Sequence, residues 1–244
     1  MSSSHGLDSK YWCIVPAAGV GSRMGAAHPK QYLSLLDKTI CEHTLLRLLS
    51  VPRIEKIIVC VSGADTWWPG LSLNGDPRIL SVEGGGERCD SVLNGLHLLR
   101  TMAADSDWVL VHDVARPCVR VADIERLMQI TASQQNGGIL ATPVRDTLKR
   151  SGKTGSGENK NTVAATVDRS NLWHALTPQL FRVGELTAAL QGALQAGVTV
   201  TDEASAIEWQ GGTPLLVEGH PDNIKITHPN DLPLALLFLK QTHN

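Results

Sequence analysis

Short β-rich segments alternate with longer amphipathic segments along nearly the whole length of this 244-residue chain. This alternation is typical of a mostly parallel sheet with helices on both faces, so we predict an α/β fold of the Rossmann-like type. The segments expected to form strands are residues 11–17, 54–61, 78–83, 108–112, 138–142 and 213–217. The segments expected to form helices are residues 40–50, 87–101, 122–135, 184–196, 202–210 and 229–239.

One segment interrupts the alternation. Residues 145–150 and 162–169 have the character of two short strands, and the stretch between them, 151–161, is polar and rich in glycine. Strands joined in this way predict a β-hairpin that projects from the domain, although the loop composition also fits a disordered insertion. A projecting hairpin has too little core to fold alone. Such an arm is usually an oligomerisation element or a lid, and we expect a dimerisation arm at about residues 145–170.

Composition limits the classes of function. The formal net charge is −2 and the isoelectric point is near 6.5, which is not the basic balance that binding to nucleic acid or to an anionic membrane requires. The five cysteines are scattered without metal-site spacing, and no apolar run approaches the roughly 20 residues of a membrane span. We expect a cytoplasmic protein with reduced thiols, a disordered leader at residues 1–10 and a single domain over residues 11–244.

The clearest candidate for binding chemistry follows the first predicted strand. Residues 16–25 read PAAGVGSRMG, and Pro29 and Lys30 come shortly after. A glycine-rich turn at the carboxyl end of a parallel strand leaves backbone N–H groups for phosphate, and Arg23 and Lys30 add positive charge. The glycine spacing differs from that of a dinucleotide-binding fingerprint, and the Gly-Lys-Ser/Thr of a P-loop is missing. We predict a loop that binds phosphates.

Two more motifs lie at the starts of loops. Residues 83–88 read EGGGER and are followed by Ser91, so a glycine-rich turn leads into a predicted helix. Residues 112–117 read HDVARP at the carboxyl end of an apolar strand, where open α/β sheets place their ligands. There Asp113 would serve a metal or a substrate hydroxyl and Arg116 a phosphate, unless the two form a structural ion pair.

Five further motifs follow along the chain. The sequence reads PVRDTLK at 143–149, VDR at 167–169, ALTPQ at 175–179, TDEAS at 201–205 and DNIKIT at 222–227. Taken together, over about residues 11–239, they resemble the 2-C-methyl-D-erythritol 4-phosphate cytidylyltransferases of the non-mevalonate isoprenoid pathway. That resemblance implies a nucleotidyltransferase fold, a homodimer, and transfer of CMP from CTP to the polyol phosphate with release of pyrophosphate.

The resemblance also implies roles for particular residues. It gives catalysis to Arg23, Lys30 and Lys225, and we expect Lys225 on a late strand. It gives contacts with the acceptor to Asp113, Arg116, Thr147, Arg169 and Thr177, with Arg169 supplied by the neighbouring subunit. It gives contacts with the nucleotide to Pro16, Ala17, Ala18, Gly19, Gly21, Gly85, Gly86 and Ser91, although the family often has an acidic residue in place of Gly86.

The expected mechanism depends on charge rather than on a general base. A phosphate monoester has a second pKa of about 6, so the acceptor is largely its own nucleophile near pH 7. Positioning and stabilisation by cations should then supply most of the catalysis. We expect Mg²⁺ as the cofactor, held mainly by the CTP phosphates, with Asp113 as the candidate protein ligand.

Three other functions fit parts of the sequence. Ribitol 5-phosphate cytidylyltransferases share the phosphate loop and the second turn, and residues 143–150 and 167–179 distinguish the two families. A non-catalytic nucleotide-binding module would have little need of Arg23, Lys30, Asp113 and Lys225 together. An NAD-dependent dehydrogenase is opposed by the glycine spacing.

Overall fold

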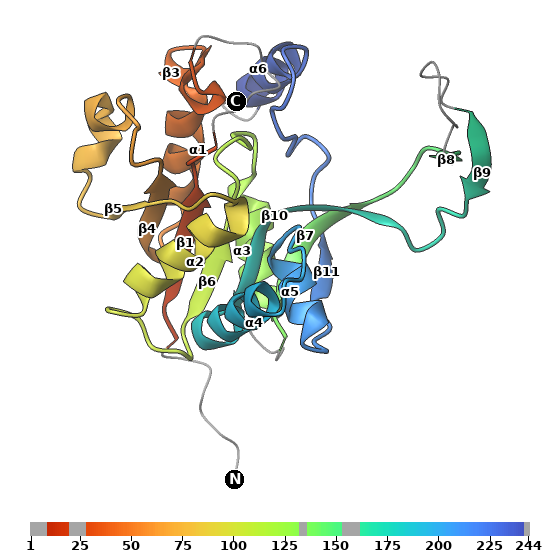
Figure 1. Ribbon diagram of the computed structural model, residues 1–244. Helices are drawn as coiled ribbons and strands as arrows, with labels where there is room; N and C mark the ends of the chain where they lie inside the picture. Colours follow the sequence, from red (N-terminus) through yellow and green to blue (C-terminus); the bar gives the residue numbers. More distant parts are fainter. Residues whose placement is uncertain (1–8, 20–27, 132–135, 153–161, 242–244) are drawn as a thin grey trace.

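The computed structural model of the protein describes residues 9–19, 28–131, 136–152 and 162–241. At its centre is a seven-stranded sheet with the order β11-β7-β10-β6-β1-β4-β5 (Figure 1). The strands of this sheet are β1 (Tyr11–Pro16), β4 (Ile54–Val61), β5 (Ile79–Glu83), β6 (Trp108–Val111), β7 (Gly138–Pro143), β10 (Trp173–Arg182) and β11 (Leu215–Glu218). Two small antiparallel ribbons lie apart from it, β2 (Ser34–Leu35) with β3 (Lys38–Thr39), and β8 (Leu148–Ser151) with β9 (Val163–Val167).

Helices cover both faces of the sheet, as the sequence predicts. They are α1 (Ile40–Leu49), α2 (Arg88–Leu99), α3 (Val121–Thr131), α4 (Val183–Gln195), α5 (Glu203–Trp209) and α6 (Asp231–Gln241). Short 3-10 turns complete the elements at η2 (Lys30–Tyr32), η3 (Trp68–Gly70) and η4 (Ser72–Gly75). None of the helices in the described part of the chain combines the length and apolar character that crossing a bilayer requires.

The alternation of side chains along β1 divides the core into two layers. Cys13 and Val15 pack with residues of α1 and α3 on one face, and Trp12 and Ile14 pack with residues of α2, α4 and α5 on the other. Every residue of β1 up to Val15 is buried. A strand covered on both faces has a nearly continuous apolar sequence, which is why this segment is recognisable in the sequence.

Strand β10 is a correction to the predicted alternation. It is antiparallel to both β6 and β7, whereas the sequence analysis expected no strand there. Pro178 lies within this strand, and the pairing with β7 shifts between Ala175 and Gln179. Proline cannot donate to the ladder and is rare in central strands, so the local sequence does not read as one.

The reversed direction of β10 places its first residues at the carboxyl edge of the sheet. Gln179 pairs with Val111, the last residue of β6, so Thr177 lies beyond the end of that strand. The long strands β7 and β10 lead outward to the ribbon of β8 and β9, which stands away from the sheet in Figure 1. The predicted hairpin is therefore confirmed. Most of its side chains are exposed, and Val163 is 65% exposed.

The buried carboxylate of Asp107 connects the segments at the amino ends of β1 and β6. Asp107 accepts hydrogen bonds from the backbone N–H of Lys10 at 3.0 Å, from that of Ala104 at 3.1 Å and from the indole N–H of Trp12 at 3.1 Å. Ser9 accepts a further bond from Arg182, so Ser9 and Lys10 at the end of the predicted leader contact the body of the protein. Residues 1–8 lie outside the described residues.

The contacts of Asp107 predict a large effect on stability. Asp107→Ala would leave three N–H donors without their acceptor, so we expect the free energy of unfolding to fall by about 2–4 kcal/mol in urea denaturation. Asp105→Ala is the control, because the Asp105 pair with Arg100 is exposed and should contribute under about 1 kcal/mol. Equal losses in the two variants would contradict the argument.

Candidate functional site

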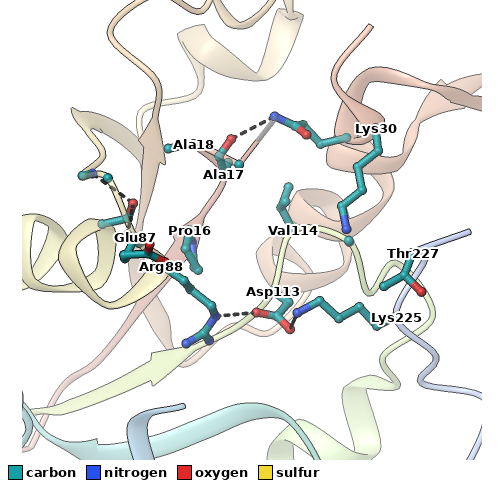
Figure 2. Close-up of a pocket in the computed structure, with 16 residues that line it drawn as sticks. Pro16, Ala17, Ala18, Lys30, Glu87, Arg88, Asp113, Val114, Lys225 and Thr227 are labelled. Atoms are coloured by element: carbon teal, nitrogen blue, oxygen red, sulfur yellow. Dashed lines mark hydrogen bonds and ion pairs between the residues drawn. The ribbon is translucent and has the colours of Figure 1, made fainter. Parts of the chain in front are cut away.

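A cavity of about 310 Å³ lies at the carboxyl edge of the sheet, where β1 and β6 end. It is the place where parallel sheets bind ligands, because backbone and side chains of several loops converge there. Figure 2 shows the residues around it. The lining residues are Pro16, Ala17, Ala18, Gly19, Lys30, Gln31, Gly85, Gly86, Glu87, Arg88, Ser91, Asp113, Val114, Ala115, Lys225 and Thr227.

The first wall is the end of β1 together with η2. The side-chain amide of Gln31 donates to the carbonyl of Ala17 at 2.9 Å, which ties the two segments together. Lys30 lies on the cavity wall, and its Nζ donates to the carbonyl of Ile226 at 3.0 Å. The predicted residues Gly21 and Arg23 belong to the same loop but lie outside the described residues.

The second wall is the glycine-rich turn before α2. Its Gly85 N–H donates to the hydroxyl of Ser91 at 3.0 Å, and that hydroxyl donates to the carbonyl of Glu87 at 3.2 Å. A Cβ on Gly84 would come within 2.5 Å of the Cβ of Ala18, and one on Gly85 within 2.2 Å of the Cβ of Asp90. These two positions therefore require glycine.

Gly86 differs from its two neighbours. A Cβ at this position would have Asp90 Oδ2 as its nearest neighbour, at 3.8 Å, so the turn has room for a side chain there. The turn can therefore keep its shape whether this position holds glycine, as in this chain, or a larger residue.

Asp113 is the centre of an ionic network at the floor of the cavity. Its Oδ1 accepts from Nε of Arg88 at 2.9 Å, and its Oδ2 lies 2.8 Å from Nζ of Lys225. Figure 2 shows Arg88 and Lys225 approaching this carboxylate from opposite sides. The guanidinium of Arg88 also binds both oxygens of Glu203, at 2.7 and 3.0 Å. These ion pairs thus connect the starts of α2 and α5 with the loop after β6 and with the segment that contains Lys225.

The network keeps Asp113 and Arg88 charged at neutral pH. Burial by itself would raise the pKa of Asp113, but the cations of Arg88, Lys225 and Arg116 outweigh it and hold that pKa well below its ordinary range. Burial by itself would lower the pKa of Arg88, and the carboxylates of Glu203 and Asp113 outweigh it and raise that pKa. The cavity therefore has a fixed anion with cations on either side.

The buried His112 supports Asp113 through Thr177. His112 Nε2 lies 3.1 Å from the carbonyl of Arg116, so this nitrogen must carry the proton, and Nδ1 accepts from the hydroxyl of Thr177 at 3.0 Å. The same hydroxyl accepts from the backbone N–H of Asp113 at 3.1 Å. Burial lowers the pKa of His112 to about 4, so the ring is neutral at pH 7. Thr177 therefore positions the backbone of Asp113.

The position of Lys225 corrects one expectation. The residue lies in an irregular segment between β11 and α6 and not on a strand. This segment is fixed by other contacts. Arg116 donates to the carbonyl of Asn223 at 2.7 Å, and the side-chain amide of Asn223 donates to the carbonyl of Thr177 at 2.7 Å. Polar contacts thus hold Lys225 beside Asp113 without a sheet ladder.

Four of the five predicted acceptor residues do not line the cavity of their own copy: Arg116, Thr147, Arg169 and Thr177, whose hydroxyl holds the backbone of Asp113. Arg116 is 9% exposed and lies 3.5 Å from Asp113 Oδ2, which makes it an ion-pair partner of that carboxylate. Thr147 and Arg169 are exposed at the base of the arm, Thr147 before β8 and Arg169 after β9. Their predicted contacts with the acceptor stay predictions.

Two charged residues of the network received no role from the sequence. Arg88 follows the glycine turn as the first residue of α2, and Glu203 is the first residue of α5. Both belong to quoted motifs, EGGGER and TDEAS. Nothing local in the sequence indicates that residues 115 positions apart form a bidentate pair. Only their place within shared motifs was available as a signal.

No three metal-binding side chains of His, Cys, Asp or Glu gather within the described ranges, which omit residues 20–27 and 153–161. Both oxygens of Asp113 are already engaged by cations. The cavity therefore suits a divalent ion that arrives with its own oxygen ligands, such as phosphate oxygens, better than a resident metal.

Known proteins resemble the chain over nearly its whole length. The sequence profile of IspD, 2-C-methyl-D-erythritol 4-phosphate cytidylyltransferase, matches residues 11–241. The 2-C-methyl-D-erythritol 4-phosphate cytidylyltransferase of Hahella chejuensis is 54% identical over 234 residues, which cover 96% of this chain and 95% of that protein. The cytidylyltransferase of the same name from Vibrio parahaemolyticus is 52% identical and covers 96% of this chain and 97% of its own.

The fold is shared as well. The crystal structure of 2-C-methyl-D-erythritol 4-phosphate cytidylyltransferase from Francisella tularensis superposes with a TM-score of 0.81 at 37% identity, covering 94% of this chain and all of that one. These matches confirm the predicted nucleotidyltransferase fold and the predicted resemblance. Sequence and fold together show that the chain belongs to the 2-C-methyl-D-erythritol 4-phosphate cytidylyltransferase family.

Proposed function

We propose that the protein transfers the cytidylyl group of CTP to 2-C-methyl-D-erythritol 4-phosphate and releases pyrophosphate. The observation that carries the proposal is the arrangement of Lys30, Arg88 and Lys225 around one cavity whose other wall is the glycine turn before α2. The turn would hold the nucleoside, Lys30 and Lys225 would face the phosphates, and Arg88 would hold Asp113 beside Lys225. Family membership identifies the nucleotide and the acceptor.

The chemistry requires two anions to meet in line. The acceptor phosphate is largely dianionic near pH 7 because its second pKa is about 6, so it can attack the α-phosphorus without a general base. The residues of the chain then have to lower the repulsion and stabilise charge that grows on the α-phosphoryl oxygens. Lys30 and Lys225 serve this purpose from neighbouring positions, since Lys30 Nζ binds the carbonyl of Ile226, and the ionised Asp113 keeps the Lys225 ammonium in place.

We propose Mg²⁺ as the cofactor, bound chiefly by oxygens of the triphosphate. The support is the donor set of the cavity, in which Asp113 already binds Arg88 and Lys225. The ion would neutralise the triphosphate and stabilise the pyrophosphate that leaves. The residues of the chain itself orient the nucleotide, hold the acceptor and exclude competing water.

The arm suggests that the working form is a homodimer. The proposal is supported by the exposure of Thr147 and Arg169 and by the distance of the ribbon from the sheet in Figure 1. Neither residue lines the cavity of its own copy. A second copy that packs against the ribbon would cover apolar residues such as Val163 and would bring Arg169 to the neighbouring cavity.

We place the protein in the cytoplasm. All five cysteines are free and buried, and burial raises the pKa of the Cys60 and Cys118 thiols to about 12. Such thiols are unreactive, as expected of a protein of a reducing compartment.

The proposed function is tested by pyrophosphate release. We expect turnover with CTP and 2-C-methyl-D-erythritol 4-phosphate, and a kcat/KM for ATP that is lower by about 100-fold or more, because a site that hydrogen-bonds one base leaves polar groups unpaired with another. Ribitol 5-phosphate is the matched acceptor control. A preference for ribitol 5-phosphate would contradict the assigned acceptor, and absence of turnover with any CTP pair would contradict the reaction.

Removal of the Lys30 ammonium should affect the rate more than substrate binding. We expect Lys30→Ala to lower kcat by about 100-fold or more with a smaller change in either KM, because the charge it faces grows in the transition state. Lys38→Ala is the control, since Lys38 pairs with Asp37 outside the cavity. Steady-state kinetics in which only KM rises would contradict this role.

The shared-site dimer predicts recovery of activity in a mixture. Arg169→Ala protein and Lys30→Ala protein should each be nearly inactive. A heterodimer would contain one site damaged twice and one intact site, so statistical exchange should restore about a quarter of the wild-type activity. Mass spectrometry verifies the exchange. If heterodimers form and no activity returns, Arg169 serves its own subunit or neither.

A further inference from the structure

Glu203 is a buried carboxylate that does not reach the cavity. It is 0% exposed and is not among the lining residues, yet both of its oxygens are bound by the guanidinium of Arg88. Arg88 does line the cavity, and its remaining Nε donates to Asp113. One residue, Arg88, therefore lies between Glu203 and Asp113, and Asp113 connects Arg88 to Lys225.

Stability alone does not explain such a pair. Taking two charges out of water costs about as much as their attraction returns, and apolar residues of similar volume usually serve as well or better. A bidentate pair does confer orientation, because the planar fork of Arg88 matches the two oxygens of a carboxylate in one geometry. With both terminal nitrogens of the planar group bound by Glu203, the direction of the Nε–H is fixed, and it points toward Asp113.

The start of α5 is held so that Glu203 has little freedom. Asp202 caps this helix by accepting from the backbone N–H of Ser205 at 3.0 Å. Gln179 of β10 accepts from the backbone N–H of Ala204 at 2.9 Å and donates to Asp202 at 2.8 Å. These hydrogen bonds attach the start of α5, and with it Glu203, to the central sheet. Arg88 then connects Glu203 to Asp113 at the floor of the cavity.

We propose that Glu203 is a positioning residue of the transfer reaction: it orients Arg88, which holds Asp113 and through it the ammonium of Lys225 toward the reacting phosphates. The inference depends on the proposed function, since it names the residue that fixes the positions of charged groups in the same site. It predicts that a group outside the cavity controls the rate of the chemical step.

The test is Glu203→Gln, which keeps the shape of the side chain but removes its charge and turns one acceptor into a donor. We expect kcat to fall by about 10- to 100-fold, because small displacements of reacting groups have effects of this size. The KM for CTP should stay within about threefold, because Glu203 contacts no lining residue of the nucleotide turn other than Arg88. Glu208→Gln is the matched control, with the same charge change on the exposed side of α5.

A purely structural role would give a different result. It would lower Tm and the yield of folded protein while leaving kcat per folded molecule and the ratio of kcat to KM as in Glu208→Gln, and that outcome would overturn the inference. An inactive wild type would instead contradict the proposed function, so the two failures are distinguishable.

A double-mutant cycle shows whether Glu203 acts through Arg88. Arg88→Met removes the link, so adding Glu203→Gln to it should change kcat by less than about twofold, although the same change in wild-type Arg88 protein has its full effect. If the two substitutions instead lower kcat by factors that multiply in the double variant, Glu203 does not act through Arg88 and the inference is overturned.

A charge-conserving variant keeps the test valid if Glu203→Gln folds poorly. Arg88→Lys retains the positive charge but cannot bind Glu203 at two points while reaching Asp113. We expect the same loss of kcat with Tm close to that of the wild type. Wild-type kcat in this variant would overturn the inference.

Discussion

The bridge that Arg88 forms between Glu203 and Asp113 is the interaction on which the site depends. It connects the start of α5, the start of α2 and the loop after β6, which lie far apart in the sequence. Asp113 in turn binds Lys225, in an irregular segment that is also held by the backbone hydrogen bond from Ile226 to Ala115 and by the contacts of Asn223. Ion pairs and hydrogen bonds together therefore give the floor of the cavity its shape.

The antiparallel strand β10 has two functions in this arrangement. Its reversed direction carries Thr177 past the end of β6, where the hydroxyl supports the backbone of Asp113. Gln179, two residues later, fixes the start of α5. One strand therefore supports the ionic network at two points, and the start of this strand leads to the arm.

Much of this architecture could be predicted from the sequence. A strand buried on both faces, such as β1, is a nearly continuous apolar run, and in the turn before α2 a Cβ would collide at Gly84 and at Gly85. Lys30 and Asp113 were predicted because each lies in a loop that follows an apolar strand, and Ser91 was predicted because its motif resembles that of the family. Arg88 and β10 were missed because a long-range ion pair and a proline within a central strand leave no such pattern.

By itself the sequence determined the fold class, the glycine-rich motifs and the family, because apolar periodicity and ordered motifs are local properties of a chain. Only the tertiary structure decided which charges meet. Glu203 and Arg88 are 115 residues apart, and their pairing, the burial of Arg116 behind Asp113 and the placement of Lys225 without a strand all depend on distances that exist only once the sheet has formed.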